Sequence, residues 1–183
     1  MPERETYSIV IAGLKRELRL FEVAPRLRIA LLNILGDTEL VQACAAALIE
    51  KTKGIDYDII LTAETKSIPL AYEFSAQTNK PYVVLRKSYK FYMGEAIKAE
   101  TLSITTGAPQ TLFLDEKDHQ LIMGKKILVV DDVVSTGSTL DGMRSIVAQA
   151  EAYIAGEVAV LTEGDEEHWN GIISLGHLPL FRD

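Results

Sequence analysis

The stretch from residue 127 to residue 139 reads ILVVDDVVSTGST. Its opening run is apolar throughout, which predicts a strand that is buried on both faces. Two acids follow, then a short loop around Gly137 and a helix from about residue 138 to residue 150. A buried strand that leads through a loop into a helix is typical of a βαβ unit, so the stretch predicts an α/β fold.

The loop after this strand is predicted to bind a phosphate group. Backbone N–H groups at the start of a helix lack partners within the helix, and the helix dipole favours an anion there. Gly137 lets a phosphate approach the backbone closely. Further donors are the hydroxyl groups of Ser135, Thr136, Ser138 and Thr139. The alternative is a helix that Ser135 or Ser138 merely caps.

Asp131 and Asp132 cannot bind phosphate, but they suit the hydroxyl groups of a sugar or a hydrated Mg²⁺. Carboxylates that can bind hydroxyl groups lie beside amides that can bind phosphate, and this combination indicates a sugar phosphate. The stretch lacks the Gly-Lys-Ser/Thr of a Walker A loop and the Gly-x-Gly-x-x-Gly of a dinucleotide site. In the alternative interpretation the two acids are simply solvated.

Other segments extend this pattern into a Rossmann-like parallel sheet flanked by helices. We predict strands at residues 57–62, 81–86, 126–131 and 157–162, and helices at residues 37–53, 69–78 and 138–150. Ligands of such sheets bind beyond the carboxyl ends of the strands. Three strand ends carry charged residues, and this is where we expect the site.

The remaining segments are harder to interpret. Residues 1–33 show no clear pattern, and residues 87–119 are polar and irregular. Within the second segment we expect a hairpin through residues 102–104 and 111–114. Near the C-terminus, residues 172–175 and 178–181 are expected to form a strand pair at the edge of the sheet.

Charged side chains follow two of the predicted strands. Arg86, Lys87 and Lys90 come after one strand, and beside a sugar phosphate such cations stabilise the charge of a departing pyrophosphate. The alternative is a solvated loop. The other strand is followed by Glu64, Thr65, Lys66 and Ser67. The alternative here is a plain turn into a helix, capped by Thr65 or Ser67.

Together these motifs resemble the type I phosphoribosyltransferase family. The resemblance implies that Asp131 and Asp132 bind the ribose hydroxyls of phosphoribosyl pyrophosphate, that residues 135–139 hold its 5′-phosphate, and that Mg²⁺ is the cofactor. The basic element matches that of adenine and orotate enzymes. In the implied pyrophosphate loop, Lys66 and Ser67 replace the family's Arg and Gly. The residues expected to act in catalysis are Asp131, Asp132, Lys66 and Arg86.

The resemblance also implies a purine base, adenine first, with hypoxanthine, guanine and xanthine as alternatives. The base is expected to lie against Val133 or Val134, beneath the N-terminal segment. We expect one domain over residues 1–183, with a hood at about 1–36 and a core at 37–183, and a homodimer. A flexible loop at 91–107 is expected to cover the reaction; its Glu95 is either an acid/base candidate or a solvated charge.

A different class of function stays open. The Lys66-Ser67 pair and the missing Glu-Tyr-Gly of the adenine-enzyme loop fit a regulator that binds phosphoribosyl pyrophosphate without catalysis. A DNA-binding regulator is not expected, because the predicted core begins near the start of the chain and the net charge is −7.

Composition limits the classes of partner. With 183 residues, 48% hydrophobic and 25% charged, the chain has the balance of a globular domain. The net charge of −7 argues against a nucleic-acid surface, and no apolar run approaches the ~20 residues of a membrane span. The N-terminus is not expected to be a signal peptide. The single cysteine, Cys44, predicts a reducing, cytoplasmic setting and a place on a buried helix face.

Overall fold

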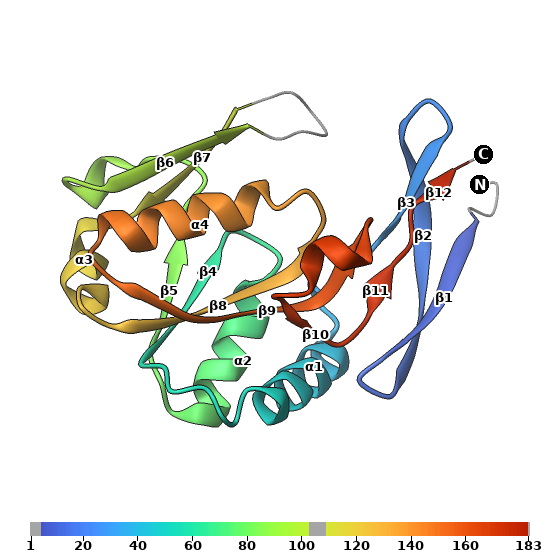
Figure 1. Cartoon of the computed structure of the whole chain (residues 1–183), viewed down its shortest axis with the longest axis horizontal. Helices are drawn as coiled ribbons and strands as arrows, with labels where there is room; N and C mark the ends of the chain where they lie inside the picture. The colour runs from blue at the N-terminus through green and yellow to red at the C-terminus, as the bar shows by residue number, and fades with distance from the viewer. Residues whose placement is uncertain (1–4, 103–108, 183) are drawn as a thin grey trace.

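A six-stranded parallel sheet forms the centre of the protein (Figure 1). The computed structural model describes residues 5–102 and 109–182. The strand order is β10-β9-β8-β4-β5, and β11 also pairs with β9. The four longer strands are β4 (Ile59–Ala63), β5 (Tyr82–Leu85), β8 (Lys126–Val134) and β9 (Tyr153–Glu163). The predicted α/β sheet is therefore confirmed.

Helices cover both faces of this sheet, as expected. They are α1 (Thr38–Lys51), α2 (Ile68–Thr78), α3 (Glu116–Ile122) and α4 (Ser138–Gln149). Helices α1 and α2 pack on one face, against Ile60, Leu128 and Val130, while α4 packs on the other face, against Ile59, Leu61 and Val129. Asp37 begins α1 by accepting a hydrogen bond from Leu40 N at 3.1 Å. Cys44 is fully buried on this helix, also as expected.

The central strand β8 is longer than the sequence pattern indicated. We expected it to end at Asp131, but it continues to Val134 because β9 runs beside it and supplies partners up to Thr162. The two acids therefore lie within the strand and not after it. The sheet holds the backbone of both residues, and this fixes the positions from which their side chains extend.

A separate antiparallel sheet stands beside the core (Figure 1), and this region gave no clear pattern in the sequence. Its strands are β1 (Thr6–Ile11), β2 (Leu14–Ala24), β3 (Leu27–Leu31) and β12 (Phe181–Arg182). Ala12 and Gly13, with φ of 49° and 81°, form the turn between β1 and β2. We call this sheet the hood.

The C-terminal segments differ from the prediction. They lie at the sheet edge as expected, but they do not pair with each other: β10 (Ile173–Ser174) and β11 (His177–Leu178) each pair with β9 in parallel. The chain then crosses to the hood, where β12 pairs with β3. The unpaired edge of β9 explains the difference, because it offers backbone partners to both short strands.

The expected hairpin is present as β6 (Ile97–Leu102) and β7 (Pro109–Leu114). Part of its predicted first arm, residues 103–104, lies outside the described residues, as does the last part of the predicted cover at 91–107. The neighbouring segment is more regular than predicted. It contains the short 3₁₀ helix Phe91–Met93, and α3, which begins at Asp115. No helix in the described part of the chain is long and apolar enough to cross a membrane.

Candidate functional site

The site lies at the carboxyl ends of β8, β4 and β5. These strands are neighbours in the sheet and run in parallel, so the three charged segments that follow or end them meet at one edge. The structure thereby brings together Asp131 and Asp132, residues 64–67 and Arg86. The sequence argument for a shared strand edge is correct for these residues.

The phosphate loop, residues 135–139, connects β8 to α4. Gly137 stands at the start of α4 with φ of 79°, and the structure shows no side-chain hydrogen bond that caps this helix among the described residues. Ser135 is exposed, and the hydroxyls of Thr136 and Ser138 lie 3.1 Å apart. The alternative of a serine-capped helix is therefore wrong, and no side chain of the described residues caps the first N–H groups of α4.

The two acids of β8 are buried side by side. Asp131 is 8% exposed and Asp132 is 6% exposed, so they are not the solvated pair of the alternative interpretation. The backbone N–H of Asp132 donates to Asp131 Oδ1 at 2.9 Å. Burial, together with the negative charge of Asp132, raises the pKa of Asp131 to about 7. A ligand that donates hydrogen bonds, or a cation, would relieve this repulsion.

Lys66 connects three parts of the molecule. Its Nζ lies 2.8 Å from Asp132 Oδ2 and donates to the carbonyl oxygen of Leu32 at 3.2 Å. Asp132 Oδ2 is buried, and no described residue gives it a hydrogen bond of good geometry. The contact with Lys66 is therefore an ion pair that leaves acceptor capacity on the carboxylate.

These carboxylates fit the Mg²⁺ that the family resemblance implies. Mg²⁺ prefers oxygen ligands, and it commonly binds through one or two carboxylates while it keeps several waters. Asp132 Oδ2 is a buried oxygen that is paired with Lys66 but accepts no hydrogen bond from the described residues, and Asp131 lies next to it. Both could hold a hydrated cation without any third protein ligand. The described residues contain no cluster of three or more acids, histidines or cysteines with metal-binding geometry.

The loop after β4 is only partly as expected. Ser67 is buried at the start of α2, where its hydroxyl donates to the carbonyl oxygen of Ala63 at 3.1 Å and makes no capping hydrogen bond to the helix. Thr65 is exposed and follows a cis peptide bond from Glu64. Ser67 thus holds the N-cap position of α2, as the alternative expected, but without a side-chain cap. Two side chains of this loop reach the acids: Lys66 pairs with Asp132, and hydrogen bonding from Ser67 opposes the rise in the pKa of Asp131.

Glu64 joins this loop to the segment after β5. Its carboxylate forms an ion pair with Arg86 Nε and accepts a hydrogen bond from the backbone N–H of Lys87 at 2.8 Å. Arg86 also pairs with Phe113 through both backbone groups, at 2.9 and 2.8 Å. Lys87 and Lys90 are exposed. Arg86 is thus held at the rim, while the two lysines are free to reach a ligand.

Val134 has a different place from the one expected, whereas Glu95 is exposed, as a solvated charge would be. Val134 is buried in the core beneath α4, because successive residues of a strand point to opposite faces, so it cannot contact a base. Val133 is half-buried on the other face, toward the core that the hood shares. Glu95 is exposed, and its backbone N–H donates to Glu116 Oε2 at 3.1 Å. Of Val133 and Val134, only Val133 therefore remains a candidate for contact with the base.

The sequence argument missed Glu163 and Trp169. Glu163 ends β9 and is 7% exposed. Burial raises the pKa of its carboxyl, and the charge of Lys66 offsets only part of this rise. Its carbonyl oxygen accepts a hydrogen bond from Trp169 Nε1 at 2.9 Å. The available signals were an acid directly after a predicted strand and a lone tryptophan in a polar segment.

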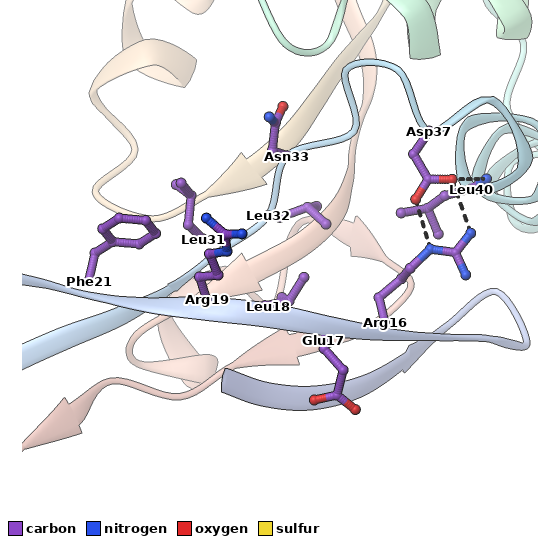
Figure 2. Close-up of a pocket in the computed structure, with 10 residues that line it drawn as sticks. All are labelled: Arg16, Glu17, Leu18, Arg19, Phe21, Leu31, Leu32, Asn33, Asp37 and Leu40. Atoms are coloured by element: carbon purple, nitrogen blue, oxygen red, sulfur yellow. Dashed lines mark hydrogen bonds and ion pairs between the residues drawn. The ribbon is translucent and has the colours of Figure 1, made fainter. Parts of the chain in front are cut away.

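The hood contains a cavity of about 350 Å³ between β2 and the chain that leads into α1 (Figure 2). Phe21 and Leu31 lie at one end, and Arg16 closes the other end through a two-pronged contact with Asp37, at 2.7 and 3.0 Å. Leu32, which also lines the cavity, accepts the hydrogen bond from Lys66. The hood is thus tied directly to the acid pair.

Comparisons with known proteins agree with this geometry. The family model of the phosphoribosyl transferase domain matches residues 31–168. The hypoxanthine/guanine phosphoribosyltransferase of Methanothermococcus okinawensis is 33% identical over 131 residues, which are 72% of this chain and 67% of that protein. The adenine phosphoribosyltransferase structure from Thermoanaerobacter pseudethanolicus has a TM-score of 0.68 at 18% identity, and covers 94% of this chain and 95% of that chain. This structural likeness shows the fold.

Regulators are among the relatives as well. The purine biosynthesis transcriptional repressor PurR of Bacillus subtilis is 28% identical over 135 residues, which are 74% of this chain and 46% of the regulator. The transcriptional activator PurR of Lactococcus lactis is 29% identical, and the match covers 84% of this chain and 55% of that protein. The chain thus spans about half the length of the regulators it matches.

Proposed function

Because the chain belongs to the phosphoribosyl transferase domain family, we propose that it transfers the phosphoribosyl group of phosphoribosyl pyrophosphate to a purine base. The observation that carries the proposal is the acid pair Asp131 and Asp132 beside the uncapped start of α4, with Lys66 in contact with the acids. Carboxylates for the ribose hydroxyls, amides for the 5′-phosphate and a cation for the pyrophosphate lie at one strand edge.

In the proposed reaction a ring nitrogen of the base attacks the anomeric carbon, and pyrophosphate leaves with the electrons of the broken C–O bond. Asp131 and Asp132 accept hydrogen bonds from the ribose hydroxyls and fix the sugar. The loop at 135–139 anchors the other end of the sugar, so the anomeric carbon is held between two fixed points. Asp131 and Asp132 would also hold Mg²⁺, which would supply positive charge for the pyrophosphate.

The cations act on the leaving group. Lys66 starts in an ion pair with Asp132, and the developing charge of pyrophosphate gives it a second anionic partner. Arg86 is kept at the rim by Glu64, and the exposed Lys87 and Lys90 can turn toward the phosphates. Fixed positive charge of this kind lowers the barrier for departure without a covalent intermediate.

We propose that the base lies against Val133, beneath the hood. The hydrogen bond from Lys66 to Leu32 supports this place, because it holds the hood next to the acids. Adenine stays our first prediction from sequence. The second candidate is hypoxanthine or guanine, favoured by the likeness to the Methanothermococcus enzyme. From the family resemblance we also expect a homodimer, which light scattering tests.

The experiment is a panel assay with Mg²⁺ and phosphoribosyl pyrophosphate, in which adenine, hypoxanthine, guanine, xanthine and orotate are offered separately. Chromatography should find one purine nucleoside monophosphate, formed with equimolar pyrophosphate. Asp131→Asn combined with Asp132→Asn should abolish turnover in the same assay. Near-normal activity of this double variant would refute the role given to the acids.

A non-catalytic binder is the alternative of a different class. It is favoured by the likeness to the PurR regulators and by Lys66-Ser67 in the pyrophosphate loop. If no purine yields product but calorimetry detects binding of Mg²⁺-loaded phosphoribosyl pyrophosphate, this alternative replaces the enzyme. If calorimetry detects no binding either, both proposals fail.

A further inference from the structure

Trp169 packs against the glycine of the phosphate loop. A Cβ atom placed on Gly137 would lie 2.9 Å from Cη2 and 3.3 Å from Cζ3 of the Trp169 indole. These distances are too short for a real side chain, so the benzene edge of the indole fills the space that any other residue at position 137 would need. Gly137 is therefore required both by its φ of 79° and by the ring beside it.

The indole is itself fixed in place. Its Nε1–H donates to the carbonyl oxygen of Glu163 at 2.9 Å, and Glu163 is the last residue of β9, the strand beside β8. The backbone carbonyl of Trp169 accepts a hydrogen bond from Ile172 N at 2.8 Å. The ring is partly buried and packs against the core beneath α4. A ring tied to the sheet in this way can act as a rigid support.

The phosphate loop has few other restraints. Within it, the hydroxyls of Thr136 and Ser138 lie 3.1 Å apart, and Asp141 N donates to the carbonyl oxygen of Gly137 at 2.8 Å. No side chain caps α4 in the part of the chain that the structure describes. A loop of this kind binds an anion well only if its N–H groups point inward before the anion arrives, because ordering them on binding lowers the affinity.

We propose that Trp169 is a positioning residue for the phosphate loop. The indole packs on Gly137 and holds the N–H groups at the start of α4 in the orientation that a 5′-phosphate requires. This inference rests on the proposed function, since it assumes that the loop binds the phosphate of a phosphoribosyl group. It assigns no contact between the indole and the base or the sugar.

Trp169 is the only tryptophan of the chain, so the protein carries its own reporter. The emission of an indole depends on its surroundings, and this indole touches the residue at the centre of the phosphate loop. Ribose 5-phosphate bound in the loop should therefore change the intrinsic fluorescence. The change should be half-maximal at a free ligand concentration equal to the dissociation constant that calorimetry measures independently.

The test is a titration of the full chain with ribose 5-phosphate, by calorimetry and by fluorescence, for the wild type and three variants. Trp169→Ala should weaken binding about 10-fold, because the loop loses its support. Trp169→Phe keeps a flat ring and should restore the affinity to within about threefold of the wild type. The control Tyr153→Ala removes a ring that is 67% exposed at the other end of β9, and should change nothing.

The outcomes separate this inference from the proposed function. Wild-type affinity in folded Trp169→Ala overturns the positioning role but leaves the proposed function intact. If Trp169→Ala does not fold, the wild type decides: calorimetric binding without any fluorescence change overturns the role. If the wild type binds no ribose 5-phosphate, the loop does not hold that phosphate and the positioning role is overturned, while the assay with Mg²⁺ and phosphoribosyl pyrophosphate decides the proposed function separately. The role is supported if Trp169→Ala loses affinity for ribose 5-phosphate and Trp169→Phe recovers it. The fluorescence change of the wild type should follow the same binding curve as calorimetry.

Discussion

Lys66 Nζ lies 2.8 Å from Oδ2 of Asp132, so a cation of the loop after β4 is paired with an acid of β8 in the free protein. The side chain of Lys66 is 39% exposed and that of Asp132 only 9%. The lysine therefore lies at the boundary between the buried acids and the solvent. From this position it can neutralise Asp132 before the substrate binds and attract pyrophosphate afterwards.

This relationship predicts that Lys66→Gln lowers the rate much more than it lowers stability. The charge that develops on pyrophosphate loses a fixed partner, and the loss of such a group lowers kcat by about 100-fold or more. Steady-state kinetics with the best base of the panel measures this effect. The matched control is Lys53→Gln, which removes an exposed lysine paired only with Glu50. Equal activity of the two variants would contradict the role of Lys66.

Cys44 should be inert in the native protein. Burial raises the pKa of its thiol to about 12, and the side chain is fully buried on α1. Since the thiolate is the reactive form, a thiol reagent at pH 8 should label less than about one tenth of the folded chains over an hour. After denaturation in urea, labelling should reach one thiol for each chain. Rapid labelling without denaturant would show that α1 opens or that Cys44 has another environment.

The core could be predicted from sequence because each of its elements carries its own local signal. Strand β8 contains the continuous apolar run at residues 127–130, and α1 has Asp37 at its start. The hood could not be predicted in the same way. The sequence of β2 does not alternate regularly between charged and apolar residues, because residues 15–17 are all charged and Leu20 and Phe21 are both apolar. One of its apolar side chains, Val23, also stays exposed. The last strand of the hood, β12, comes from the other end of the chain.

The site shows the same division between local and long-range information. The acids and the phosphate loop belong to one stretch of sequence, and both were found there. The contact of Lys66 with Leu32 joins residues 34 positions apart, and Trp169 reaches Gly137 from beyond the next strand. Such contacts depend on how the sheet edge and the hood are placed in space. A strand-and-loop pattern carries no information on that placement.

Gly137→Ala should separate the effect of the phosphate loop from that of backbone strain. The added Cβ would lie 2.9 Å from the Trp169 ring, and the φ of 79° is unfavourable for alanine by about 1–2 kcal/mol. The control Gly13→Ala meets the same strain at φ of 81°, but nothing lies within 4 Å of its Cβ. Urea denaturation should show a loss of stability in both variants, and the loss should be larger in Gly137→Ala because its Cβ also overlaps the indole. Calorimetry should show weaker binding of ribose 5-phosphate in Gly137→Ala alone. Equal binding by the two variants would contradict a role of this loop in holding the phosphate.

The raised pKa of Asp131 predicts how stability depends on pH. Burial moves this pKa from an ordinary value of 3.8 to about 7, so between these two values the folded protein keeps a proton that the unfolded chain loses. The folded state is therefore destabilised as the pH rises from about 4 to about 7, and the destabilisation is complete above pH 7. Asp131→Asn removes the titrating group while it keeps nearly the same shape.

The measurement is urea denaturation of the wild type and Asp131→Asn at pH 5 and pH 8. Because groups distant from the acid pair titrate alike in the two proteins, the difference between their free energies of unfolding reports on Asp131 and its interaction with Asp132. Asp131→Asn should gain stability relative to the wild type at pH 8 by on the order of 1 kcal/mol or more. Mg²⁺ should reduce this gain, since a cation at the acid pair stabilises the ionised carboxylate of the wild type alone. A difference that does not change with pH would mean that Asp131 is ionised in the folded protein throughout this range, and that the acids do not repel each other as described.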